Sequence, residues 1–109
     1  DDDCRARWDR AVPLLRTALT RAPDRIDAIF TLGLSYLYLN RPGEARNYLQ
    51  IVHDRQPWAP HVNFYLGDTY RLLGDTRARE HLEQARDWSP TPLWRDLAAE
   101  ALARLGADG

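Results

Sequence analysis

The one cysteine and the three histidines of this sequence, Cys4, His53, His61 and His81, are the first candidates for metal binding or nucleophilic catalysis. Histidines that bind one metal ion from the same helix usually stand three or four positions apart, and no two of these three do so. Cys4 lies near the N-terminus and would need a distant histidine to activate it. No glycine-rich phosphate-binding loop is present. We therefore expect no metal, no cofactor and no enzymatic activity.

The composition is that of an ordinary globular domain. The 109 residues include 44% hydrophobic and 28% charged residues, which is enough for one domain with its own core. The 15 basic residues, all of them Arg, nearly balance 16 acidic ones, so a broad nucleic-acid surface is not expected. No apolar run is long enough to span a membrane. The single cysteine favours a reducing compartment, so we expect the cytoplasm; the periplasm stays open if the sequence is an excised domain.

The elements that position these side chains follow from an internal repeat. Three residues recur after 34 positions and four more recur after 33. A fixed period of this length predicts a stack of similar structural units. The first copy consists of Leu32, Gly33, Tyr36, Ala45, Leu49, Val52 and Pro57, and the second of Leu66, Gly67, Tyr70, Ala78, Leu82, Ala85 and Pro90.

Each copy is predicted to be a pair of antiparallel helices. Ile29, Leu32, Tyr36 and Leu39 recur at steps of three and four, which places them on one helical face. A pair of this kind buries its apolar face only by stacking on neighbours.

A glycine interrupts the first helix of each copy. In an exposed helix Gly33 or Gly67 would cost about 1 kcal/mol relative to Ala, so two glycines in register indicate a close approach of another helix. Ala45 and Ala78 are the expected small residues on the facing helix. We therefore predict a Gly/Ala contact in each pair.

The order of the repeated residues resembles the tetratricopeptide repeat (TPR) family, whose pattern runs aromatic, Leu-Gly, Tyr, Ala, Phe or Leu, Ala, Pro. The resemblance implies an all-α fold of about six helices, stacked as antiparallel pairs in a right-handed superhelix. It also implies that the chain is a protein–protein interaction module, an adaptor or assembly scaffold.

The resemblance divides the chain into four parts. Residues 5–23 match the second helix of an incomplete repeat, residues 24–59 and 60–90 are full repeats, and residues 91–106 form a terminal capping helix. The match of the first part rests on Trp8, Ala11, Leu15, Ala18 and Pro23.

Helix ends are predicted from capping residues. Asp24 and Asp75 are the expected N-caps, and Gly74 is expected to end the helix before Asp75. Pro13 favours a first helix that begins near Asp9, because a start near Arg5 would leave Pro13 inside the helix and kink it.

In TPR proteins the first helices of the pairs line a concave groove that commonly binds peptides. Phe30 and Phe64 occupy the same position in successive repeats, so they would either form an aromatic strip in the groove or pack against neighbouring helices. The subset of TPR domains that binds a C-terminal carboxylate has Lys and Asn where this chain has Phe30 and Leu34, which disfavours that mode. The resemblance assigns to the groove Asp27, Phe30, Leu34, Leu37, Tyr38, His61, Phe64, Asp68, Arg71, Asp96, Glu100 and Arg104.

The expected partner is a protein or peptide with apolar anchors. Asp27, Asp68, Asp96 and Glu100 surround the apolar positions of the groove, which suggests that the partner also has some basic residues. Neither nucleic acid nor insertion into a membrane is expected.

The incomplete first repeat suggests an alternative function. Trp8, Val12, Leu15 and Leu19 lack the helix that would cover part of them, and an uncovered apolar face commonly marks an interface. The chain would then be a structural module that forms a homodimer through this face. Residues 1–7 could instead fold back over it.

Overall fold

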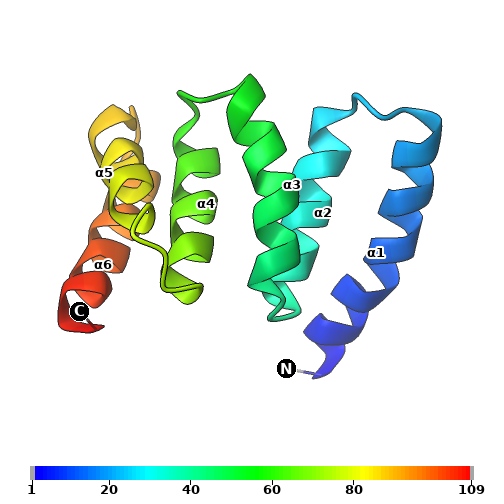
Figure 1. The fold of residues 1–109 in the computed structure, drawn as a ribbon, viewed down its shortest axis with the longest axis horizontal. Helices are drawn as coiled ribbons and strands as arrows, with labels where there is room; N and C mark the ends of the chain where they lie inside the picture. The colour runs from blue at the N-terminus through cyan, green and yellow to red at the C-terminus, as the bar shows by residue number, and fades with distance from the viewer. Residues whose placement is uncertain (1, 109) are drawn as a thin grey trace. The chain divides into compact units, whose positions relative to one another are not determined.

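The computed structural model describes residues 2–108, which form six α-helices and no strand (Figure 1). The all-α class predicted from the sequence is confirmed. The chain divides into two compact units, Asp1–Val52 and His53–Gly109. In the part of the chain that the structure describes, no helix is long and apolar enough to cross a membrane.

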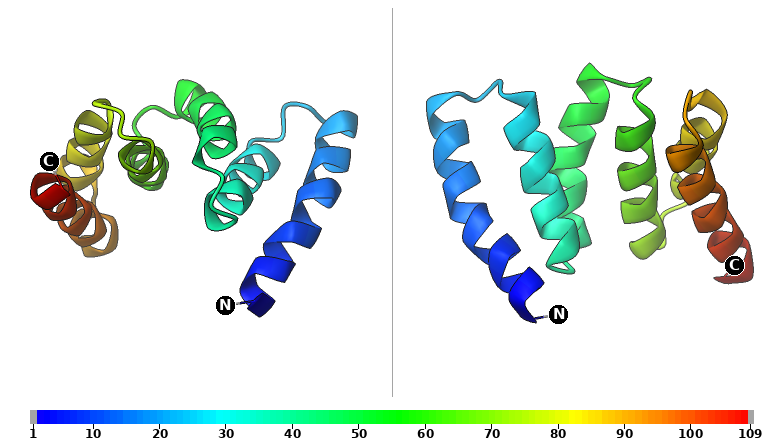
Figure 2. Two further views of the ribbon diagram at one scale, coloured as in Figure 1. Left: turned by 60° about the horizontal axis from the view of Figure 1, so that its bottom comes forward. Right: turned by 180° about the vertical axis from the view of Figure 1, so that it is seen from behind.

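The first unit contains three helices that alternate in direction (Figures 1 and 2). They are α1 (Asp2–Arg21), α2 (Ile26–Tyr38) and α3 (Pro42–Arg55), the last of which ends three residues into the second unit. α1 packs against α2.

The second unit contains α4 (Pro60–Leu72), α5 (Ala78–Trp88) and α6 (Pro92–Asp108). α5 packs against α4, and α6 packs against both α5 and α4 (Figure 2). Pro60 and Pro92 each begin a helix, where the missing N–H of proline costs nothing.

The two full helix pairs are each held together at their glycine. A Cβ on Gly33 would lie 2.9 Å from both Cγ and Cδ2 of Leu49, and a Cβ on Gly67 would lie 2.8 Å from Cγ of Leu82. The prediction that an alanine is the residue closest to each glycine is therefore wrong, because the closest residue is a leucine. The leucine follows Ala45 or Ala78 by one turn, and helical side chains extend toward the N-terminus, which brings the leucine over the glycine.

The turns inside the two pairs have the same geometry. Asn40 (φ 60°) and Gly74 (φ 70°) adopt the left-handed conformation directly after α2 and α4. In the first turn the Arg41 amide donates to the Tyr36 carbonyl (2.8 Å), and in the second the Asp75 amide donates to the Tyr70 carbonyl (2.9 Å). The prediction that Gly74 ends its helix is confirmed.

The second copy is shorter by one residue because its second helix begins differently. The Ala45 amide donates to the carbonyl of Arg41, four residues earlier, whereas the Ala78 amide donates to the carbonyl of Asp75, three residues earlier. The start of α5 is thus one residue shorter than the start of α3, and the contact of Gly67 with Leu82 is kept.

Two predictions about helix starts are wrong. α1 begins at Asp2, so Pro13 lies inside the helix and not in its first turn. The N-cap of α2 is Arg25 and not Asp24, and no side chain caps it; the Arg25 guanidinium instead pairs with the Asp27 carboxylate at 2.7 Å.

The start of α5 also differs in detail from the prediction. Its N-cap is Arg77 and not Asp75. The Asp75 carboxylate nevertheless accepts a hydrogen bond from the Arg77 amide at 2.9 Å, so it still satisfies a backbone group at this end of the helix.

The glycine contact predicts that the same substitution destabilises the protein at one glycine and not at another. Gly67→Ala is expected to lower the free energy of unfolding by about 1–3 kcal/mol, because the new Cβ would also lie 3.1 Å from the Leu82 backbone nitrogen. Gly43→Ala is the matched control, since nothing lies within 4 Å of a Cβ there, and it should leave stability unchanged or slightly higher. Urea unfolding followed by circular dichroism measures both; equal stability of the two variants would contradict the close contact.

Candidate functional site

Four aromatic rings gather between α4 and α6 in the second unit. Trp94 lies at the centre, with its ring centroid 5.8 Å from that of Phe64, 5.7 Å from that of Tyr65 and 6.1 Å from that of His61. Phe64 and Tyr65 also contact each other edge to face at 5.2 Å. All four residues are half-buried, so each ring both packs and faces solvent. We call His61, Phe64, Tyr65 and Trp94 the aromatic cluster.

Sequence reasoning found only half of this cluster. His61 and Phe64 were predicted groove residues, whereas Tyr65 and Trp94 were missed. Aligning Ala99 with Gly67 places Trp94 at the position of Val62, which is fully buried. The large ring of Trp94 at a position that faces the preceding helix was the sequence feature that could have indicated its place in the cluster.

The cluster is electrically neutral. Burial lowers the pKa of His61 below its ordinary value, so its imidazole is uncharged at neutral pH. Next to it on α4, the Asp68 carboxylate accepts a hydrogen bond from Arg71 at 2.9 Å. On α6 the Arg104 guanidinium lies 2.9 Å from the Glu100 carboxylate, and Asp96 is exposed. Two of the three predicted groove carboxylates in this unit are therefore neutralised by an arginine.

The predicted groove residues of the first unit all lie on α2. Phe30, Leu34 and Leu37 are half-buried on α2. Asp27 is exposed, and the hydrogen bond from Arg25 lowers its pKa. Tyr38 is 51% exposed and stacks on Trp8 of α1, with ring centroids 4.9 Å apart.

The predicted interface on α1 is partly covered by its own unit. Trp8 contacts Tyr38, and Leu19 lines a cavity against α2 and α3, while Val12 and Leu15 are half-buried. The most exposed apolar side chain of α1 is one that sequence reasoning missed, Leu14, at 73%.

The repeat register places Leu14 at a position that holds a ring in both full repeats. Its counterparts are Tyr48 in the first full repeat and His81 in the second. Tyr48 stacks on Tyr36 with centroids 5.7 Å apart, and His81 stacks on Tyr70 at 5.5 Å. At this position α1 has the aliphatic Leu14, which is not an aromatic ring and lies 73% exposed.

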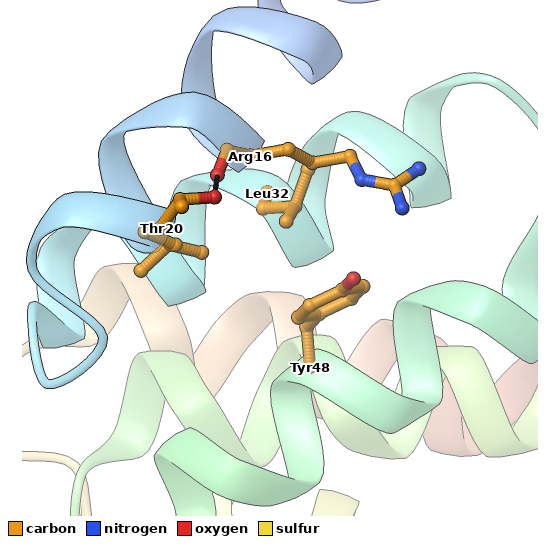
Figure 3. A pocket seen from close by; sticks show the side chains of 5 residues that line it. Arg16, Thr20, Leu32 and Tyr48 are labelled. Atoms are coloured by element: carbon orange, nitrogen blue, oxygen red, sulfur yellow. Dashed lines mark hydrogen bonds between the residues drawn. The ribbon is translucent and has the colours of Figure 1, made fainter.

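A cavity of about 210 Å³ opens between the helices of the first unit (Figure 3). Its lining combines apolar, hydroxyl and cationic side chains. Arg16, Leu19 and Thr20 come from α1, Leu32 from α2 and Tyr48 from α3.

A buried polar pair replaces apolar packing in the second unit. The Asn63 side-chain amide donates to the carbonyls of Pro57 (2.9 Å) and Ala59 (3.2 Å), so its oxygen is left to accept from His81 Nδ1 at 3.0 Å. The counterparts in the first unit are Ile29 and Tyr48, so both partners change together.

His53 lies against the same pair. Its ring centroid is 4.8 Å from that of His81, in an edge contact. The pKa of His81 is lowered to about 4, chiefly by burial and also by the nearby His53 and Arg77, whereas Glu80 and Asp75 act in the opposite direction. His81 is therefore neutral at neutral pH.

None of the described residues forms a metal-binding arrangement of three or more His, Cys, Asp or Glu side chains. Cys4 is exposed at the surface of α1.

Comparison with known proteins identifies one segment. A family model described as a tetratricopeptide repeat matches residues 27–57. This segment contains the first complete copy of the repeated residues, so the resemblance to the TPR family is confirmed there. No curated protein matches the chain.

The buried His81 predicts a pH-dependent loss of stability. Because its pKa in the folded protein (about 4) lies below its ordinary 6.5, the unfolded chain binds a proton first as the pH falls. The stabilisation is complete above pH 6.5 and is lost between about pH 6.5 and 4, by about 3 kcal/mol.

The matched control is the double variant Asn63→Ile/His81→Tyr, which introduces the pair present in the first unit. Urea unfolding between pH 7 and 4 should show a smaller loss of stability in this variant than in the wild-type chain. If both proteins lose the same free energy over this range, His81 is not the titrating group.

Proposed function

We propose that this chain, in which residues 27–57 form a tetratricopeptide repeat, is an adaptor that binds an extended peptide or a helix at the α4/α6 face of its second unit. The repeat itself is a protein–protein interaction motif, and its family is in general not catalytic. The binding face, the partner chemistry and the test below are specific to this chain.

The aromatic cluster is the observation that best supports this proposal. Aromatic rings dominate binding energy at protein interfaces because each buries a large apolar area while losing little side-chain freedom. Trp94 contacts three other rings, so the orientation of the cluster is set before any partner arrives. A preorganised anchor of this kind reduces the entropy lost on binding.

The ion pairs around the cluster define the chemistry of the partner. Asp68 pairs with Arg71 and Glu100 with Arg104, and His61 is neutral, so little unbalanced charge remains near the rings. A strongly charged segment would gain little there. The face therefore suits a segment whose anchors are apolar or aromatic, and the expected basic residues of the partner would contribute only at its edge, near the exposed Asp96.

A displayed peptide library selected on the 109-residue chain tests this face. Peptides that bind should lose at least tenfold in affinity to Trp94→Ala, since truncating an interface hot spot costs about 2 kcal/mol or more. Trp88→Ala is the matched control, because Trp88 is 52% exposed and lies outside the cluster. Raising the salt concentration should weaken binding only slightly.

Equal losses in Trp94→Ala and Trp88→Ala, or no loss in either, would contradict the proposal. Circular dichroism of each variant verifies that the helices are retained.

Self-association through α1 is the second candidate, and the exposure of Leu14 favours it. In both full repeats the counterpart of Leu14 stacks on a tyrosine of the first helix, Tyr36 or Tyr70. α6 matches a first helix and has Leu102, half-buried, at this tyrosine position. An aliphatic pair of Leu14 with Leu102 from a second copy would replace the aromatic pairs of the full repeats.

Native mass spectrometry at increasing protein concentration tests this candidate. We expect dimers or longer head-to-tail assemblies in the wild-type chain and monomers for Leu14→Glu, because the introduced carboxylate would be buried against Leu102. Leu93→Glu is the control, since Leu93 is also exposed, at 58%, but lies outside the predicted contact. A wild-type chain that stays monomeric at high concentration would exclude self-association.

A further inference from the structure

We propose that the cavity in the first unit is a binding site for a carboxylate attached to a small apolar body. The residues of α1, α2 and α3 that line the cavity all belong to the first unit, and none of them is part of the aromatic cluster. The proposal is therefore independent of peptide binding at the α4/α6 face.

The inner part of the cavity is apolar. Leu32 is fully buried on α2, and Leu19 of α1 is half-buried beside it. The Thr20 hydroxyl, also part of the lining, already donates to the Arg16 carbonyl at 3.0 Å. An apolar ligand group would thus meet aliphatic walls with no competing donor from Thr20.

The mouth of the cavity is polar and suited to an anion. In Figure 3 the guanidinium of Arg16 and the hydroxyl of Tyr48, both of which line the cavity, point toward the same side. Within residues 2–108, no carboxylate forms an ion pair with Arg16 and the Tyr48 hydroxyl forms no hydrogen bond. A guanidinium and a phenol beside an apolar cavity offer a charge-assisted and a neutral donor to one carboxylate.

Tyr48 is held in this position by packing. Its ring stacks on Tyr36, with centroids 5.7 Å apart and planes 15° from parallel. The hydroxyl therefore stays at the mouth of the cavity, and no large rearrangement is needed before a ligand binds.

The residues that correspond to this lining one repeat later differ from it. His53 and His81 are the counterparts of Leu19 and Tyr48, and their rings touch with centroids 4.8 Å apart. The counterparts of Arg16 and Thr20 are Gln50 and Asp54, so the cation is missing as well. The chemistry of this lining is thus specific to the residues of the first unit and is not shared by the repeat in general.

The size of the cavity limits the ligand. Pockets for drug-sized molecules span roughly 300–1,000 Å³, so a volume of about 210 Å³ suits one short aliphatic chain or one apolar side chain. Two sources provide this chemistry: a free small carboxylic acid, or the C-terminal residue of a peptide that ends in an apolar side chain.

Titration of the isotope-labelled 109-residue chain, followed by NMR of its methyl groups, tests the site. We expect hexanoate to shift the Leu19 and Leu32 methyl signals saturably, and hexanamide to bind about tenfold more weakly because it has no charge for Arg16. An acetylated tripeptide ending in leucine, with either a free or an amidated C-terminus, distinguishes the two sources. Tighter binding of the free-carboxylate tripeptide than of hexanoate assigns the site to peptide ends, and the reverse assigns it to free acids.

Three variants separate binding at the cavity from general attraction to a basic helix. Arg16→Gln should weaken hexanoate binding about tenfold, and Tyr48→Phe about threefold while keeping the ring stack. Arg10→Gln, an exposed arginine on the same helix, should bind as the wild-type chain does. No saturable shift with either carboxylate ligand, equal binding of hexanoate and hexanamide, or equal losses in Arg16→Gln and Arg10→Gln would overturn the proposal.

Discussion

The close approach of a glycine to a leucine is the contact on which each helix pair depends. Gly33 lies against Leu49, and Gly67 lies against Leu82, at separations that leave no room for a Cβ. This contact sets how near the two helices of a pair lie, and so which of their residues become buried. Ala45 and Ala78 are fully buried beside it, and Tyr36 and Tyr70 lie next to it with almost no exposure. Asn40 and Gly74, both in the left-handed conformation, form the turns that bring the second helix of each pair back alongside the first.

Some of the differences between the two units are pairs of residues that change together. Tyr48 stacks on Tyr36 in the first unit, and His81 stacks on Tyr70 in the second, where Asn63 in place of Ile29 gives the imidazole a hydrogen-bond partner. Because the backbone contact is kept, such exchanges alter local chemistry without altering the helix pair. The cavity beside Arg16 and the aromatic cluster around Trp94 are two further local features, the first lined by residues of the first unit and the second formed by residues of the second unit.

Sequence reasoning predicted those features that depend on spacing along the chain. The recurrence of Gly33 as Gly67 indicated the helix pairs, and Gly74 indicated the end of α4. It failed where a distant side chain decides the outcome. Leu49 covers Gly33 because of its direction on α3, which spacing alone did not reveal. Trp94 lies on α6 and completes an aromatic cluster whose other rings lie on α4. At the start of α2, Asp27 pairs with Arg25, and Asp24 is not the N-cap.

The proposed adaptor function requires that the α4/α6 face bind the partner through its rings. The most direct measurement is a set of intermolecular NOEs between a library-selected peptide and the isotope-labelled chain. The account predicts NOEs from the indole protons of Trp94 and the ring protons of Phe64 to apolar side chains of the peptide, with His61 at the edge of the contact. NOEs that come only from α1, or from residues outside the aromatic cluster, would contradict it.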